Sequence, residues 1–447
     1  MMKWWKRLWR DRRGNALVIA GAALPLLVGA AGLATDTIEW TLWKRELQRA
    51  ADSAAIAGAY ERVSGANETE ATAAVSHDLT INQQTGMPLV GGYPQVSFPA
   101  DTGEMRQQVR VVLAVQKRLP FSSLFMSAPP TIIARATAAS VAGNGDACVH
   151  ALETSAGKSG ISITGNAEIN MPDCTMHSNS PSSNSAYAKG SSEVYADAVS
   201  AVGGIQESSS WHINSYDPYA PSLEDPFKDV TPNPSDMKCA GEWVTKGKNV
   251  EWVPAVLDEN TDFENAKDAD GNDANCFESL SVGSNTVLDQ IPDNFGPIYI
   301  NGGDANIQGD FSCTGCAIVL TNQDSASTDI GELKVNASSK INMSAPTSGE
   351  FAGIAIYQDR RAQDSPSAQN KVNGNSDSTI TGAHYFPSQE LDYNGTGNTT
   401  ASCTMFVARR IKFSGNSSTS NKFKSLKDCA LAGLPSASGV RRVRLVA

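Results

Sequence analysis

Histidine, charge and recognisable catalytic motifs are scarce in this sequence. Only five of the 447 residues are His, and charged residues make up 19%. The sequence has no HExxH, no GxSxG, no P-loop and no GxGxxG in a βαβ setting. These motifs mark zinc proteases, serine hydrolases and nucleotide-binding enzymes. We therefore expect no cofactor, no metal site, no nucleotide ligand and no enzymatic activity.

Basic residues are also in the minority. Lys and Arg number 36 against 47 Asp and Glu, which gives a net charge of −11. Because affinity for nucleic acids depends on Lys and Arg contacts to phosphates, nucleic-acid binding is not expected. With 40% hydrophobic residues, the chain is still apolar enough to fold.

Cysteine is absent from the first 147 residues. Eight candidate disulfide cysteines follow: Cys148, Cys174, Cys239, Cys276, Cys313, Cys316, Cys403 and Cys429. An even number confined to the later part of the chain indicates disulfides in an oxidising compartment. Spacing leaves the connectivity open, and the simplest scheme pairs the cysteines in sequence order. The CxxC at 313–316 has no partner motif for a zinc site, which favours a short-loop disulfide there.

Residues 16–35, ALVIAGAALPLLVGAAGLAT, form a long run without charge. A helix of about twenty such residues spans the roughly 30 Å hydrocarbon layer of a membrane, so we predict a transmembrane helix. A cleaved signal peptide is the alternative, but its apolar core is shorter, and here a predicted helix continues past Asp36. Residues 1–15 carry a basic cluster. The positive-inside rule places them in the cytoplasm and the bulk of the chain on the opposite side.

Residues 36–142 are predicted to form a helix followed by a small antiparallel sheet. Apolar and small residues recur at helical spacing from Ile38 to Ala57. Strand-like alternation begins near residue 104, and a second β-like run follows near Ile132. We expect the helix to pack on its own sheet, as in pilins. The alternative is lateral packing against similar helices in an assembly.

Beyond Gly143 the composition shifts to Ser, Asn, Thr and Gly, with short apolar runs. Phrases such as ISITGNAEINM recur at irregular spacing, which is typical of a parallel β-helix or solenoid. A β-sandwich is the alternative for residues 143–447. The stretch at about 205–297 has many Pro and Asp residues and is interpreted as an irregular excursion. The expected fold class is therefore α+β, with a pilin-like N-terminal unit and a mostly-β solenoid.

The segment from Arg12 to Ala59 resembles the N-terminal module of the TadE/TadG-like family of tight-adherence (Flp) pilus-assembly proteins. The resemblance rests on the basic start, the uncharged span and a set of motif residues: Asp36, Leu47, Gln48, Ala50, Ala51, Asp52, Ala54 and Ala55. Prepilin-like relatives are cleaved after a Gly and carry Glu at the fifth mature position. After Gly14 this chain has Ile19 at that position, so an uncleaved TadG-like protein is the better match. Residues 148–152, 353–360, 381–389 and 414–416 also resemble the periplasmic half of TadG-like proteins.

The resemblance implies a single-pass protein of the inner membrane, with its N-terminus in the cytoplasm and its bulk in the periplasm. It implies a structural role in the assembly of a Flp pilus and in surface adhesion. The expected partners are the membrane, pilin-like proteins and other pilus-assembly proteins.

The alternative, from another class, is an envelope-anchored β-helix that binds or cleaves carbohydrate. Such enzymes need clustered carboxylates, and the sequence offers Asp304, Asp310 and Asp359 without showing that they converge. A surface adhesin is a third hypothesis, and it requires export beyond the inner membrane.

Overall fold

The computed structural model describes most of the chain, and it divides the chain into two compact units. The described residues are 12–82, 88–103, 105–143, 146–365, 370–373, 378–394, 398–401, 403–415, 418–421, 429, 434 and 441–446. One unit comprises residues 1–141 with 443–447, and the other comprises residues 142–442. Of the basic segment expected at 1–15, residues 1–11 lie outside the described residues.

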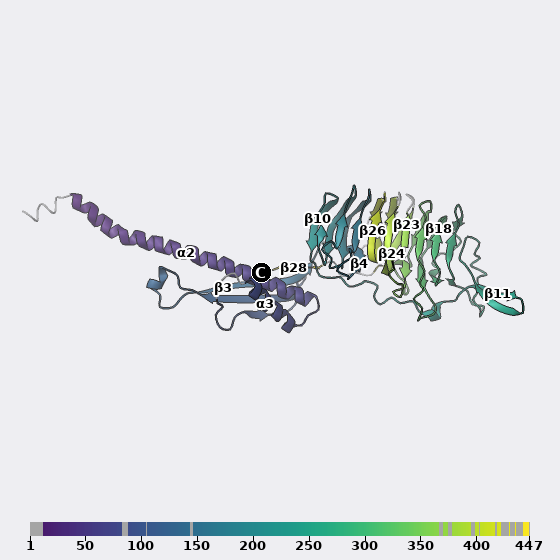
Figure 1. The fold of residues 1–447 in the computed structure, drawn as a ribbon, viewed down its shortest axis with the longest axis horizontal. Helices are drawn as coiled ribbons and strands as arrows, with labels where there is room; N and C mark the ends of the chain where they lie inside the picture. The colour runs from purple at the N-terminus through teal and green to yellow at the C-terminus, as the bar shows by residue number, and fades with distance from the viewer. Residues whose placement is uncertain are drawn as a thin grey trace, which may run out of the picture. The chain divides into compact units, whose positions relative to one another are not determined.

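In its described residues, the first unit contains two helices, a short 3-10 helix and a four-stranded sheet (Figure 1). Its elements are α2 (Arg12–Val63), α3 (Glu68–Asn82), β1 (Gln95–Ser97), β2 (Arg106–Gln116), η1 (Ser122–Leu124), β3 (Thr131–Ala142) and β28 (Arg441–Leu445). The strand order is β1-β2-β3-β28, and β1, β2 and β3 pair in antiparallel fashion. The strand β28 comes from the C-terminal end of the chain, so both ends of the sequence contribute to this unit.

The helix α2 includes the uncharged run 16–35, and its second half is rich in Ala, a strong helix former. Pro25 lies inside it. Among the described residues, α2 is the one helix that is long and apolar enough to cross a membrane, and none of its most apolar window is buried.

After α2 ends, Asn67 accepts hydrogen bonds from the backbone N–H groups of Thr69 and Glu70, and the Glu70 carboxylate accepts from the Asn67 N–H. This capping box begins α3.

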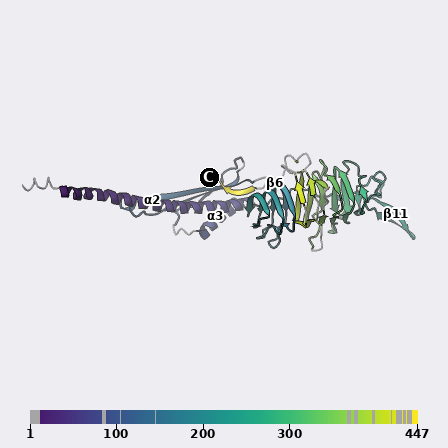
Figure 2. The ribbon, with the colours of Figure 1, turned by 90° about the horizontal axis from the view of Figure 1, so that it is seen from above.

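The second unit contains a 22-stranded sheet, and Figure 2 shows its strands stacked side by side. The strand pairs given below are parallel. One run stacks β13 (Cys276–Phe277), β16 (Gly296–Asn301), β19 (Cys316–Thr321), β22 (Ile354–Gln358), β24 (Thr379–Asn394), β26 (Thr404–Ser414), β4 (Asp146–Ala151), β6 (Glu168–Ser178), β8 (Glu193–Ala201) and β10 (Trp211–Pro218). A second run adds β14 (Leu280–Val282), β17 (Ala305–Ile307), β20 (Leu333–Val335), β23 (Asn370–Asn373), β5 (Ile161–Ile163), β7 (Ala186–Ala188) and β9 (Ile205–Gln206). The remaining strands are β15 (Val287–Leu288), β18 (Asp310–Thr314), β21 (Ile341–Ser344), β25 (Asn398–Ala401) and β27 (Ser418–Asn421).

The register of the first run is continuous. One column of aligned residues passes through ten strands in the order Cys276, Tyr299, Val319, Tyr357, Tyr385, Val407, His150, His177, Ser200 and Asp217. The spatial order differs from the chain order, because β26, near the end of this unit's sequence, pairs directly with β4 at its beginning. The unit's first and last long strands therefore lie in the middle of the stack.

The range 205–297, which was expected to be an irregular excursion, contains strands of the stack at both of its ends. These are β9 and β10 at its start and β13, β14 and β15 toward its end. Between β10 and β13, residues 219–275 contain η2 (Pro234–Asp236) and a hairpin of β11 (Gly241–Lys246) and β12 (Asn249–Pro254). In the hairpin, Trp243 lies opposite Trp252, with ring centroids 5.2 Å apart. Because β10 and β13 end the stack on opposite sides, these residues must run from one end to the other.

Candidate functional site

The motif residues of the sequence lie on α2, and several of them form the contact between this helix and the sheet of its own unit. Leu47 is 2% exposed, and Ala51, Ala54 and Ala55 are fully buried. They share a core with residues of β2 and β3: Val109, Val111, Leu113, Val115, Ile132, Ala134, Ala136 and Ala138. Small side chains on this face let the helix backbone come close to the sheet.

Gly58 continues the same contact beyond the motif. A Cβ atom at Gly58 would lie 2.8 Å from Cγ2 of Val75 on α3 and 3.0 Å from Cγ1 of Val109 on β2. The position therefore has no room for a side chain without movement of its neighbours. Gly58 lies in the segment that carries the family resemblance, but no motif in the sequence marks it as a contact residue.

The polar motif residues hold the edge of the helix to β3. The side-chain amide of Gln48 donates one hydrogen bond to Oδ1 of Asp52 and another to the backbone carbonyl of Arg135, each 2.7 Å long. Lys44 donates to the carbonyl of Ile133. Gln48 thus links α2 to β3, and Asp52 orients the Gln48 amide.

Asp36, the acidic residue after the uncharged run, is only 3% exposed. Its Oδ1 accepts a 2.9 Å hydrogen bond from the N–H of Phe121, and its Oδ2 accepts from the N–H and the hydroxyl of Ser122. Burial by itself would raise the pKa of Asp36, but the hydrogen bonds from Ser122 and Phe121 favour the carboxylate and hold its pKa below the ordinary value. Asp36 therefore attaches the loop between β2 and β3 to α2.

Gly32, one turn earlier in α2, allows that loop to approach the helix. A Cβ at Gly32 would lie 2.3 Å from Cδ2 of Phe121, so the aromatic ring lies against the helix backbone. The sequence gives no signal for the contact of Gly32, Phe121 and Ser122. No local pattern links positions that are about 85 residues apart in the chain.

The helix α2 is also the part of the chain that matches a known protein family. Residues 14–61 match the profile of the family described as "Putative Flp pilus-assembly TadE/G-like". This segment of the chain is therefore similar to the TadE/G-like family. The match confirms the family resemblance seen in the sequence, and it spans the uncharged run and all eight motif residues.

Other comparisons add little to the TadE/G-like assignment. No curated protein matches the chain. Among solved structures, the competence-associated pilin ComZ from Thermus thermophilus is similar at 9% sequence identity and a TM-score of 0.24, over 80% of this chain and 86% of that chain. A likeness at this level does not bear on the fold or the function.

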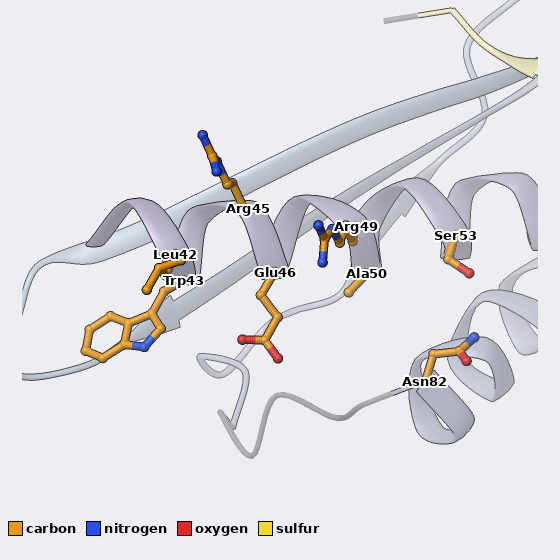
Figure 3. A pocket seen from close by; sticks show the side chains of 8 residues that line it. All are labelled: Leu42, Trp43, Arg45, Glu46, Arg49, Ala50, Ser53 and Asn82. Atoms are coloured by element: carbon orange, nitrogen blue, oxygen red, sulfur yellow. The ribbon is translucent and has the colours of Figure 1, made fainter. Parts of the chain in front are cut away.

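A groove of about 670 Å³ lies beside the TadE/G-like helix. Its lining residues are Leu42, Trp43, Arg45, Glu46, Arg49, Ala50, Ser53 and Asn82 (Figure 3). Ala50 is thus the motif residue that faces this groove. Trp43 and Glu46 project from the same side of α2. The Nζ atom of Lys117 lies 4.1 Å from the centroid of the Trp43 ring, a cation–π contact between α2 and the end of β2.

The predicted disulfides form outside the TadE/G-like segment, and all of them lie in the second unit. The bonded pairs are Cys148–Cys174, Cys239–Cys276, Cys313–Cys316 and Cys403–Cys429. Cys148–Cys174 joins the neighbouring strands β4 and β6. Cys239–Cys276 fastens the region between β10 and β13 to the first strand of the stack.

The carboxylates weighed for carbohydrate chemistry are each occupied by local partners. Asp304 forms an ion pair of 2.8 Å with Lys334, and Asp310 accepts a hydrogen bond from the N–H of Lys340. Asp359 lies 2.7 Å from Nη2 of Arg361. Burial opposes the charge on Asp359, but hydrogen bonds from Arg361 and Thr321 outweigh it and hold its pKa below the ordinary value. These contacts are structural in kind.

A buried ion cluster between β4 and β26 escaped the sequence analysis. Glu153 is fully buried, and its Oε2 lies 3.1 Å from Nε of Arg409 and 2.9 Å from Nη1 of Arg410. Arg410 also lies 2.6 Å from Asp364. Burial would raise the pKa of Glu153, but hydrogen bonds from Ser155, Arg410 and Arg409 lower it to about 2. Its partners lie about 256 residues away in sequence, so spacing gives no signal for this cluster.

Proposed function

We propose that this protein is a membrane-anchored structural component that supports assembly of a Flp pilus and surface adhesion. The carrying observation is the match of residues 14–61 to the TadE/G-like pilus-assembly family. It is supported by the division of α2, whose apolar first part exposes its side chains while its later part packs on the sheet. An exposed apolar helix continued by a packed one is suited to a protein that holds a folded unit at a membrane.

The proposed location is the inner membrane, with the N-terminus in the cytoplasm and the bulk in the periplasm. The basic cluster before the uncharged run favours this orientation. Four disulfides in the second unit favour an oxidising compartment for the part after the span.

We further propose that the second unit is a parallel β-helix that serves as a rigid spacer. The continuous register through ten strands supports this interpretation. With neighbouring strands about 4.8 Å apart, the stack would extend for roughly 40 Å. Its role would be mechanical and not catalytic, in keeping with the local pairing of Asp304, Asp310 and Asp359.

The test is to delete the gene and count surface pili by electron microscopy. Complementation should use the full chain and a chain in which residues 146–438 are replaced by a short Gly/Ser linker. This replacement keeps β28, which a simple truncation after residue 145 would remove from the first unit's sheet. We expect loss of pili on deletion and restoration by the full chain alone. An unchanged number of pili after deletion would refute the assembly role, and restoration by the shortened chain would refute the need for the spacer.

A further inference from the structure

The loop between β2 and β3, residues 117–130 (hereafter the β2–β3 loop), exposes consecutive large apolar side chains. Leu124 is 74% exposed, Phe125 is 77% exposed and Met126 is 48% exposed. Among the described residues of the first unit outside α2, this is the largest run of exposed apolar side chains. Scattered apolar residues on a surface need no explanation, but three in succession at a loop tip indicate a contact with something apolar.

The attachment of this loop sets its level along α2. Asp36 binds the backbone of Phe121 and Ser122, and the Phe121 ring lies on Gly32. Gly32 belongs to the uncharged run 16–35 and precedes its end by three residues, or roughly 5 Å along a helix. The loop is therefore fixed beside the last turn of the apolar part of α2.

The surroundings of the loop resemble those of residues at a membrane surface. Lys117 and Arg118 are exposed at the start of the loop, and Trp40 and Trp43 lie on α2 just beyond Asp36. Trp residues and long basic side chains concentrate at membrane–water interfaces, where the basic groups meet anionic lipid headgroups. The carboxylate of Asp36 lies in this contact, where it accepts hydrogen bonds from Phe121 and Ser122.

We propose that the β2–β3 loop is a second membrane contact, in which Leu124, Phe125 and Met126 insert into the lipid layer beside α2. The occupant of the apolar tip is the bilayer itself, because the tip is held against the same helix at the level of its apolar run. The first unit is then attached at two points, and its sheet has a fixed orientation at the membrane surface. The inference rests on the proposed membrane anchor.

The test uses the full chain in vesicles of phosphatidylcholine with phosphatidylglycerol. A nitroxide spin label is attached at Phe125→Cys, and its collision rates with oxygen, which concentrates in lipid, and with a water-soluble nickel chelate are compared. The native cysteines are paired in disulfides, so the new thiol is the one that reacts. Leu27→Cys in α2 is the lipid control, and Ser64→Cys in the turn after α2 is the water control. Met126→Cys provides a second reporter on the tip.

We expect the ratio of oxygen to nickel collisions at Phe125 and Met126 to be several-fold higher than at Ser64 and to approach that at Leu27. If both tip labels behave like Ser64 while Leu27 lies in lipid, the second contact is wrong and the anchor stands. If the tip labels are shielded from both reagents, a protein surface covers the tip and the lipid assignment is wrong. If Leu27 itself is accessible to nickel, the anchor fails and the inference fails with it.

Discussion

At the scale of single residues, Asp36 has a positioning role that its place in the family motif does not explain. A carboxylate at this position can accept several hydrogen bonds at once, and here it accepts three from Phe121 and Ser122. Its function is to hold a distant loop against α2.

Replacing Asp36 should release that loop. For Asp36→Ala in the full chain with a spin label at Phe125→Cys, we expect a more mobile spectrum and a lower ratio of oxygen to nickel collisions. The reason is that the backbone N–H groups of Phe121 and Ser122 lose their common acceptor. Glu39→Ala, one turn further along α2, is the matched control and should leave the spectrum unchanged. An unchanged spectrum in Asp36→Ala would show that packing of Phe121 on Gly32 is sufficient by itself.

Three buried histidines should make the second unit sensitive to acid. Burial lowers the pKa of His150 to about 4, and burial likewise lowers those of His177 and His384 to about 3. Since the unfolded chain takes up protons first as the pH falls below about 6.5, stability is complete above that pH and declines toward the folded pKa values. Between pH 7 and pH 5 we expect each histidine to reduce the free energy of unfolding by about 2 kcal/mol.

The measurement is urea unfolding of the full chain in detergent at pH 7 and pH 5. His384, whose Nδ1 lies 2.8 Å from the Tyr393 hydroxyl, is the site to replace. His384→Phe should reduce the difference between the two pH values by about one third. His77→Phe, at an exposed position of α3, should leave the difference unchanged. An equal difference in all three proteins would contradict the assignment to His384.

At the scale of elements, the ion cluster of Glu153 joins the segment directly after β4 to β26. Glu153→Gln removes the charge that faces Arg409 and Arg410 inside the protein, so we expect a loss of about 3 kcal/mol in the free energy of unfolding. Glu251→Gln is the matched control, because its ion pair with Lys246 is exposed and should contribute less than about 1 kcal/mol. The free energy of unfolding of both variants is measured by thermal or urea unfolding. Equal losses in Glu153→Gln and Glu251→Gln would contradict the prediction.

The parts of the fold that depend on local patterns could be predicted from the sequence, and the long-range contacts could not. The helical spacing of Leu47, Ala51, Ala54 and Ala55 is a local property, and so is the alternation in β2 and β3. The uncharged run 16–35 likewise predicts a membrane-spanning helix from length and composition. By contrast, the contact of Asp36 with Ser122 depends on how the chain returns to itself over long distances.

At the scale of the whole chain, strand order in the second unit predicts where the stack is most resistant to opening. Strands β4 and β26 have neighbours on both sides, whereas β10 and β13 each end the stack. Amide groups in the interior of a cooperative sheet exchange with solvent more slowly than those at its ends. We therefore expect hydrogen exchange followed by mass spectrometry to be slowest in β4, β6, β24 and β26. Fastest exchange in β4 and β26, as strands near the ends of a sequence commonly show, would contradict the observed pairing.

The pairing of β26 with β4 also sets the order in which the unit can assemble during export. If the chain crosses the membrane from the N-terminus onward, β4, β6, β8 and β10 emerge first. The edge of β4 that later pairs with β26 is then still unpaired. More than 250 residues separate Phe406 from its partner Val149. This edge of β4 therefore stays unpaired until nearly the whole polypeptide has been translocated. β26, the last long strand of the unit, then closes a seam in the middle of the stack. On that route the unit is expected to complete its folding after translocation, because the early strands lack a neighbour until the seam closes.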